Sequence, residues 1–230
     1  MNSTVAMLVR RREALPRILP FAVYIAFLVA APTLREALPS GWDGRWLYAM
    51  QIAAVLLVLA WLSSAYRELR PLALGWRDAL EATAVGIAVF IAWITLDLPW
   101  AMFDEPGAGF DPRTARGEIE WSLAAVRVFG AAAVVPIMEE LFWRSFILRW
   151  IDKSDFLQLP AAAASGRALA ISALLFGLEH NLWLAGIFAG LAYGGLYLRS
   201  NTLWSPILAH AVTNLLLGFW VIATESWSFW

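Results

Sequence analysis

Long apolar segments follow one another along this chain of 230 residues, and they constrain its fold more than any other feature. A helix needs about 20 mostly apolar residues to cross the hydrocarbon core of a bilayer. A soluble domain of this size does not carry such segments in series, and 61% of these residues are hydrophobic. In lipid each backbone N–H and C=O group must be paired within the protein, which favours helices. The sequence therefore predicts an all-α fold, a polytopic transmembrane helical bundle.

We expect seven spans, or eight if the fourth or the fifth segment splits in two. The predicted spans cover residues 18–34, 46–66, 79–103, 121–151, 161–180, 182–198 and 203–223. No soluble domain or low-complexity stretch interrupts them. We therefore expect a single integral membrane domain over residues 1–230, with a motif-bearing catalytic core at about residues 121–223.

Basic residues predict the orientation of the bundle, because cytoplasmic loops of membrane proteins are enriched in Lys and Arg. They gather before the first span, after the second and at the end of the fourth, as Arg10, Arg11, Arg12, Arg17, Arg67, Arg70, Arg77, Arg144, Arg149 and Lys153. This pattern places the N-terminus in the cytoplasm and the C-terminus outside. A basic head before an apolar run also describes a signal peptide, but six further segments favour an uncleaved first span.

Glu139, Glu140 and Arg144 form a cluster of charged residues inside the otherwise apolar sequence of the fourth span. One charged side chain at the centre of a membrane helix costs roughly 2.5 to 3.5 kcal/mol on insertion scales, so such a group is functional by default. Glu140 and Arg144 are four residues apart and share a helix face, where they partly neutralise each other. Glu139 is turned by about 100° from Glu140, so the two carboxylates face different partners.

Two more pairs have the same spacing of four residues: Phe176 with His180 in the fifth span, and His210 with Asn214 in the seventh. These are the only two histidines of the chain, which has no cysteine and hence no disulfide, thiolate metal site or cysteine nucleophile. Each pair shares a helix face, so three helices can bring a carboxylate, two imidazoles and an amide into one polar cavity.

These residue types suit hydrolysis. His180 and Glu140 can share a water molecule, while His210 and Asn214 can stabilise a developing oxyanion. A divalent metal ion, such as zinc, bound by Glu140, His180 and His210 is equally compatible with the residue types. The residues alone leave the metal-dependent and the metal-free routes open.

The ordered motifs Glu139-Glu140-x-x-x-Arg144, Phe176-x-x-x-His180 and His210-x-x-x-Asn214 resemble the CPBP family over about residues 134–217. That family comprises the CAAX prenyl endopeptidases and the bacterial bacteriocin-processing and self-immunity proteins. The Val-Pro run before Glu139, together with the compact size, also resembles the CAAX-protease-related proteins that accompany bacterial exosortase systems. The resemblance implies an enzyme, a CAAX-type intramembrane protease.

By this resemblance, Glu140 and His180 activate water, His210 and Asn214 stabilise the tetrahedral intermediate, and Glu139, Arg144 and Phe176 support the site. The mechanism that it implies is either metal-dependent or a metal-free glutamate mechanism. It also implies a membrane-associated peptide or protein substrate, lipidated or prenylated in some members, in contact with membrane lipid and without a nucleic-acid partner. The expected location is a bacterial inner membrane.

Two alternatives stay open. A non-catalytic peptide-binding or immunity protein would use the same polar cavity without cutting, and transport is a weaker option. In a purely structural interpretation, Glu140 and Arg144 form a buried ion pair, and the histidines cap and join helices.

The expected spans also place Glu140 near the cytoplasmic end of the fourth span and His180 near the outer end of the fifth. A single site then requires a fifth helix that stays shallow, or boundaries that move by about a turn. In the sixth span Gly186, Gly190 and Gly194 recur every four residues, which predicts a close-packed helical hairpin with the fifth span.

Overall fold

The computed structural model describes residues 3–70, 72, 74–105 and 107–230, with side chains from residue 13 onward. The described residues form seven long helical segments and no strand. These segments are α1 Ser3–Ala37, α2 Leu47–Trp61, α3 Trp76–Thr95, a continuous segment from α4 Trp121–Phe129 through α5 Val135–Glu140 to α6 Arg149–Asp152, α7 Gly166–Leu178, α8 Trp183–Ser200 and α9 Trp204–Thr224. Each predicted span overlaps one of them, which confirms the all-helical bundle.

Five segments in the described part of the chain are long and apolar enough to cross a membrane. They are Glu13–Ala37, Gly44–Trp61, Trp76–Thr95, Trp121–Asp152 and Trp204–Thr224. The apolar helix α7 is shorter, with 13 residues. The chain is therefore an integral membrane protein with at least five helices of spanning length.

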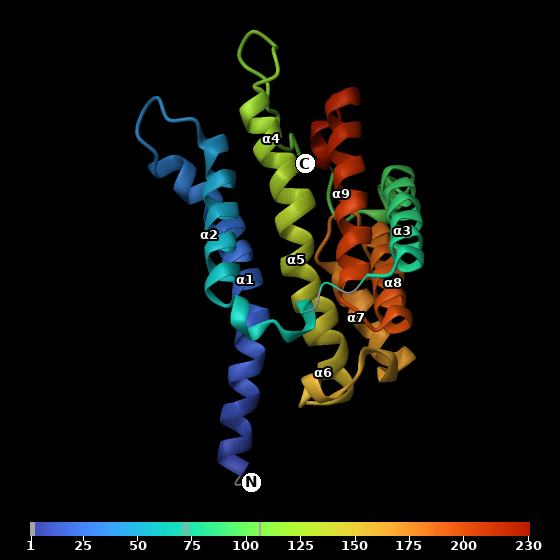
Figure 1. The fold of residues 1–230 in the computed structure, drawn as a ribbon. Helices are drawn as coiled ribbons and strands as arrows, with labels where there is room; N and C mark the ends of the chain where they lie inside the picture. The colour runs from blue at the N-terminus through green and yellow to red at the C-terminus, as the bar shows by residue number, and fades with distance from the viewer. Residues whose placement is uncertain (1–2, 71, 73, 106) are drawn as a thin grey trace.

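The bundle has three groups of helices when viewed from the side (Figure 1). The antiparallel pair α1 and α2 lies on one side, the continuous segment from α4 to α6 runs through the middle, and α3, α7, α8 and α9 lie on the other side. α1 begins at the bottom of this view, and the chain ends near the top. This arrangement surrounds the α4–α6 segment on both flanks.

A proline in α1 leaves one backbone carbonyl of this helix without its helical hydrogen bond, and a residue outside the helix donates to it. Pro20 has no N–H, so the carbonyl of Pro16, four residues earlier in α1, lacks its usual helical donor. The hydroxyl of Tyr66 donates to this carbonyl at 3.1 Å. The contact fastens the chain beyond α2 to α1.

The hairpin of α7 and α8 is packed at backbone distance, as the glycine repeat predicted. A Cβ atom at Gly190 would lie 2.7 Å from Cα of Ala173, and one at Gly177 would lie 2.4 Å from a side-chain carbon of Ile187. Only glycine allows two helices to approach so closely at these positions. The close packing fixes the position of His180, which follows α7.

Because α7 is short, Glu140 and His180 do not differ in depth in the way that the predicted spans implied. Its 13 residues rise by roughly 20 Å, so the helix ends below the full height of the 32-residue Trp121–Asp152 segment. The turn after α7 is held by the loop after α3: the amide of Asn181 donates to the carbonyl of Asp104 at 2.9 Å, and the N–H of Asp104 donates back to its side-chain oxygen at 2.9 Å. The fifth helix is thus the shallow one that a single site requires.

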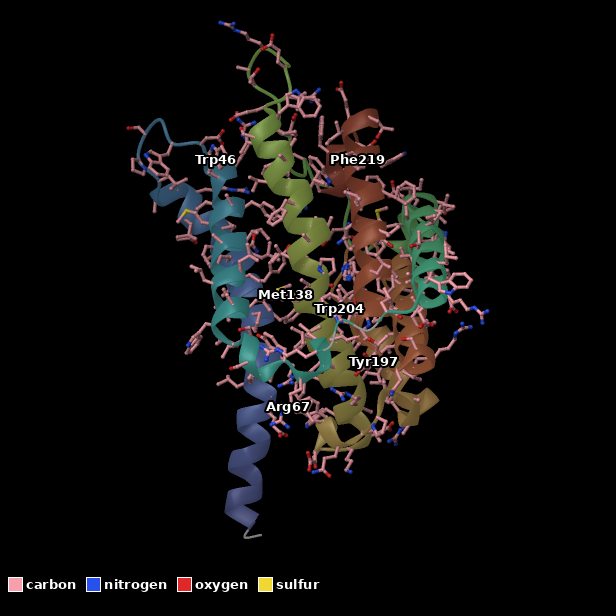
Figure 2. All side chains as sticks on the ribbon, viewed as in Figure 1. Trp46, Arg67, Met138, Tyr197, Trp204 and Phe219 are labelled. Carbon is pink, nitrogen blue, oxygen red and sulfur yellow. The ribbon has the colours of Figure 1, made fainter. Side chains whose placement is uncertain are left out.

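A buried polar network closes the opposite end of the bundle, near Arg67 in Figure 2. Arg17 of α1 pairs with Glu68 at 2.6 Å, Ser145 donates to the same carboxylate, and Arg149 lies 3.9 Å from it. Burial alone raises the pKa of Glu68, but the hydrogen bonds from Arg17 and Ser145 and the charge of Arg17 outweigh burial, so this pKa lies below its ordinary value of 4.5. The network joins α1, the α2–α3 linker and the central segment.

Candidate active site

A cavity of about 160 Å³ lies among α1, α3, the central segment, α7, α8 and α9. Five of the seven residues singled out by the sequence line it: Glu139, Phe176, His180, His210 and Asn214. The structure therefore brings the three sequence motifs together at one place. Glu140 and Arg144 lie behind the cavity wall, with their side chains almost fully buried.

Glu140 links the central segment to α9. Its Oε1 atom lies 3.1 Å from Nη1 of Arg144 and accepts a hydrogen bond from Nδ1 of His210 at 3.0 Å. The carboxylate has no exposed surface and does not line the cavity. The predicted pairing of Glu140 with Arg144 is present, and the pair supports His210.

Glu139 is the carboxylate that faces the cavity. Its buried Oε2 atom has no hydrogen-bond partner among the described residues and lies 4.0 Å from Nε2 of His210. The sequence predicts a catalytic role for Glu140 and a supporting role for Glu139; in the structure Glu139 lines the cavity and Glu140 does not. The turn of about 100° between adjacent helical residues separates the two carboxylates, and the fold directs Glu139 inward.

A π-helical stretch, Gly130–Val134, keeps one line of residues directed into the cavity. Arg127, Ala131, Val135 and Glu139 all line it, each four residues after the previous one. In a regular α-helix every such step turns by about 40°, so the line would leave the cavity within three steps. The wider π turn, with its i to i+5 hydrogen bonds, offsets this rotation.

The same π turn leaves a backbone carbonyl free to accept a hydrogen bond from Asn214. The N–H of Val135 donates to the carbonyl of Gly130, and the next residue, Pro136, has no N–H. The carbonyl of Ala131 is therefore open, and the side-chain amide of Asn214 donates to it at 2.8 Å. Sequence reasoning missed this role of Pro136, although a proline just before the paired glutamates was a visible signal.

Two aromatic rings orient the charged groups around His210. Its imidazole stacks on Tyr193 at 5.0 Å, and the hydroxyl of Tyr193 donates to Thr213 at 2.7 Å. The guanidinium of Arg144 lies over the rings of Phe176, at 4.4 Å, and of Tyr193. Phe176 thus supports the site, as expected, through cation–π contact with Arg144.

A backbone carbonyl determines which ring nitrogen of His180 carries the proton. Its Nδ1 atom lies 2.8 Å from the carbonyl oxygen of Phe176. A carbonyl only accepts hydrogen bonds, so Nδ1 carries the proton and Nε2 of the neutral ring is an acceptor. The centroids of the His180 and Trp93 rings lie 5.3 Å apart in a T-shaped arrangement. His180 therefore offers a lone pair rather than an N–H from Nε2.

The donor set does not fit a metal ion. In the part of the chain that the structure describes, no three His, Cys, Asp or Glu side chains gather closely enough to hold one. Of the predicted ligands Glu140, His180 and His210, the first already bonds directly to the third and lies outside the cavity wall. We therefore derive no step through a metal ion.

Several residues of the cavity wall were missed by sequence reasoning: Trp93, Arg127, Tyr193, Phe229 and Trp230. Arg127 carried a signal, since it is a charged residue inside the predicted fourth span. The aromatic residues carried none, because aromatic side chains are common throughout this apolar chain.

A comparison with protein families supports the resemblance seen in the motifs. Residues 121–216 match the family model for Rce1-like proteins, described as Type II CAAX prenyl endopeptidase Rce1-like. The match starts at the first residue of α4, ends within α9 and contains all seven motif residues. No curated protein and no solved structure shows significant similarity to the chain. The resemblance to the CAAX protease family is therefore confirmed for this part of the chain.

Proposed function

We propose that the Rce1-like region makes this chain an intramembrane endopeptidase, which hydrolyses a peptide bond of a membrane-associated protein or peptide. One observation carries this proposal. A carboxylate with an unpartnered oxygen, two imidazoles of fixed orientation and an amide line one cavity between apolar helices. Ionisable groups at such a position are costly in a membrane and mark chemistry by default.

Glu139 is the proposed general base, with His180 as its partner. The unpartnered Oε2 of Glu139 takes one proton from water, while Nε2 of His180 accepts a hydrogen bond from the other O–H of the same water, which stays on the oxygen. The water oxygen attacks the peptide carbonyl. Glu139 then gives its proton to the leaving nitrogen as the C–N bond breaks. A positioned general base contributes typically 10²- to 10⁴-fold to a rate.

Asn214 and His210 are the proposed donors to the developing oxyanion. Asn214 uses one N–H on the carbonyl of Ala131, and a side-chain amide has a second N–H that remains for the substrate. His210 donates Nδ1–H to Glu140 and, when its other nitrogen is protonated, presents Nε2–H to the cavity. The charges of Glu139, Glu140, Arg144 and His210 then sum to zero.

Glu140 and Arg144 are positioning residues in this scheme. Neither lines the cavity, and together they hold the ring of His210 and the face of Phe176. A preorganised donor in a water-poor site costs no reorganisation during the reaction. We further propose that α1 begins in the cytoplasm, on the ground of the basic residues near that end, and, from the family resemblance alone, that the membrane is a bacterial inner membrane.

The test is cleavage of a quenched fluorescent peptide panel by the purified protein in detergent, with prenylated and unprenylated peptides. We expect turnover by the wild type, and loss of turnover in Glu139→Gln and His210→Ala. Phe219→Ala is the matched control, because this α9 side chain is 59% exposed and does not line the cavity. The labelled Phe219 in Figure 2 lies in the upper half of α9.

A chelator arm in the same assay tests the metal. Turnover that survives the chelator supports the Glu139 and His180 route, and turnover that is lost and restored by zinc contradicts it. A wild type that binds peptide but never cuts contradicts the protease proposal and supports the peptide-binding or immunity alternative.

A further inference from the structure

Part of the wall of the candidate active-site cavity comes from outside residues 121–216, the part of the chain that matches the Rce1-like family model. Tyr24 of α1 and Trp93 of α3 precede the match, and Phe229 and Trp230 follow it. Of these four side chains, only that of Tyr24 carries a hydroxyl group. Tyr24 therefore brings a polar group from α1 into a cavity whose proposed catalytic residues all belong to the matched region.

The packing of α1 places Tyr24 at the level of Glu139. The rings of Phe21 and Phe142 are stacked with their centroids 4.0 Å apart, which sets the register between α1 and the central segment. The two run in opposite directions (Figure 1). Tyr24 follows Phe21 by three residues and Glu139 precedes Phe142 by three, and each step rises by roughly 4.5 Å. Both steps lead the same way, so Tyr24 and Glu139 lie at about the same depth.

The hydroxyl group of Tyr24 has no hydrogen-bond partner among the described residues. The backbone of this residue is held, because its carbonyl accepts from Nε2 of Gln51 at 2.9 Å. By contrast, the hydroxyls of Tyr48, Tyr66 and Tyr193 each donate to a protein oxygen, as is usual for tyrosines in an interior. The hydroxyl of Tyr24 is thus available to a molecule bound in the cavity that its side chain lines.

The two flanks of the central segment offer different groups to a bound peptide. α9 carries Asn214 and His210, the proposed donors to the oxyanion, and α1 lies on the opposite flank (Figure 1). The carbonyl oxygen of the scissile bond therefore points toward α9. In a planar trans peptide unit the N–H points the opposite way from the C=O. The scissile N–H then points toward α1, where Tyr24 lies at the level of Glu139.

We propose that the hydroxyl oxygen of Tyr24 accepts a hydrogen bond from the N–H of the scissile peptide bond. This inference rests on the proposed protease function and adds to it a residue that contacts the reacting bond. No proton is transferred at Tyr24, because the nitrogen keeps its hydrogen throughout. When water attacks the carbonyl, the nitrogen becomes pyramidal and develops a lone pair. Holding the N–H at Tyr24 turns that lone pair toward Glu139, which supplies the second hydrogen as the C–N bond breaks.

The test compares a cleavable peptide with its ester analogue, in which an oxygen atom replaces the scissile N–H and no donor remains. Wild type, Tyr24→Phe and Tyr66→Phe are assayed with both substrates. We expect Tyr24→Phe to lower the amide-to-ester ratio of kcat/KM by about 3- to 10-fold, the range for one neutral hydrogen bond. Each ratio is measured on one preparation, so it does not depend on the folded fraction.

Tyr66→Phe is the matched control for the loss of a tyrosine hydroxyl. The hydroxyl of Tyr66 donates to the carbonyl of Pro16, and neither residue lines the cavity. This variant should keep the wild-type ratio of amide to ester cleavage. An equal fall of the ratio in both variants would assign the effect to the packing of α1 and overturn the inference.

A binding arm separates this inference from the protease proposal. Labelled amide and ester peptides are titrated onto Glu139→Gln, with and without Tyr24→Phe, which requires no turnover. A preference for the amide that Tyr24→Phe removes supports the inference even if no variant cuts. A preference that Tyr24→Phe leaves unchanged in both cleavage and binding overturns it, and cleavage by the wild type then leaves the protease function intact.

Discussion

The Nδ1 atom of His210 donates to Oε1 of Glu140 at 3.0 Å, and this bond gives two adjacent glutamates different surroundings. Glu140 belongs to a buried ion pair, whereas Glu139 faces the cavity with an unpartnered oxygen. Replacing each glutamate by glutamine should therefore have different effects. Glu140→Gln should lower the stability of the fold, whereas Glu139→Gln should lower the rate of peptide cleavage.

Glu140→Gln should destabilise the protein strongly. It leaves the guanidinium of Arg144, which is 1% exposed, without its carboxylate. Breaking a buried ion pair by removing one partner typically costs about 3–5 kcal/mol. Unfolding in detergent, followed by helical circular dichroism, measures this effect. Glu139→Gln should unfold at or above the wild-type midpoint, since it removes a buried carboxylate oxygen that has no hydrogen-bond partner among the described residues; the opposite order would contradict these different surroundings.

Pro136→Ala should lower activity while the fold persists. The new N–H would compete with Asn214 for the carbonyl of Ala131, which Asn214 now contacts at 2.8 Å. Loss of a well-placed oxyanion donor costs about 10²- to 10³-fold in kcat, and partial displacement should give a smaller loss, mainly in kcat. Steady-state kinetics with unchanged KM would fit this account. A variant with wild-type kcat would show that the hydrogen bond from Asn214 to the carbonyl of Ala131 does not depend on the proline.

Gly190→Ala should destabilise the α7–α8 hairpin and displace His180. The added methyl group would lie 2.7 Å from Cα of Ala173, where no flexible side chain can yield. Overpacking of this kind costs typically about 1–3 kcal/mol. Gly195→Ala is the control in the same helix, because nothing lies within 4 Å of its added Cβ. Equal unfolding midpoints for the two variants would contradict the packing described for the hairpin.

The protein should lose stability at acid pH through Glu68. Its pKa is lower in the folded chain than its ordinary value of 4.5, so its contribution is complete above that value and is lost as the pH falls through the folded pKa. Unfolding midpoints between about pH 7 and pH 3 test this dependence. Glu68→Gln should unfold earlier at pH 7, because Arg17 loses its partner, and should show a weaker fall in acid. A variant with the same slope as the wild type would exclude Glu68 as the responsible group.

The helices of this fold could be predicted from the sequence because apolar length and flanking charges are local properties. All seven expected segments overlap observed helices, and the convergence of His180, His210 and Asn214 followed from spacing and family resemblance. The shallow position of α7 could not be predicted in the same way. It depends on the contact between Asn181 and Asp104, whose residues are 77 positions apart.

Which of Glu139 and Glu140 lines the cavity could not be predicted from the sequence either. The facing direction of a residue near a π turn depends on which hydrogen bonds the backbone makes, and a hydropathy pattern does not contain this information. Tyr24 was overlooked for a related reason. Its place in the cavity depends on the packing of α1 against the central segment, which is a three-dimensional property.

Peptide hydrolysis with Glu139 as the base is tested most directly by mass spectrometry of the peptide products formed in water enriched in ¹⁸O. Wild type, Glu139→Gln and the exposed control Phe219→Ala would be compared at equal concentrations of folded protein. The account predicts one ¹⁸O atom in the new carboxyl terminus with wild type and control, and a rate at least about 100-fold lower with Glu139→Gln. Cleavage by Glu139→Gln at the wild-type rate, or no cleavage by any of the three, would contradict it.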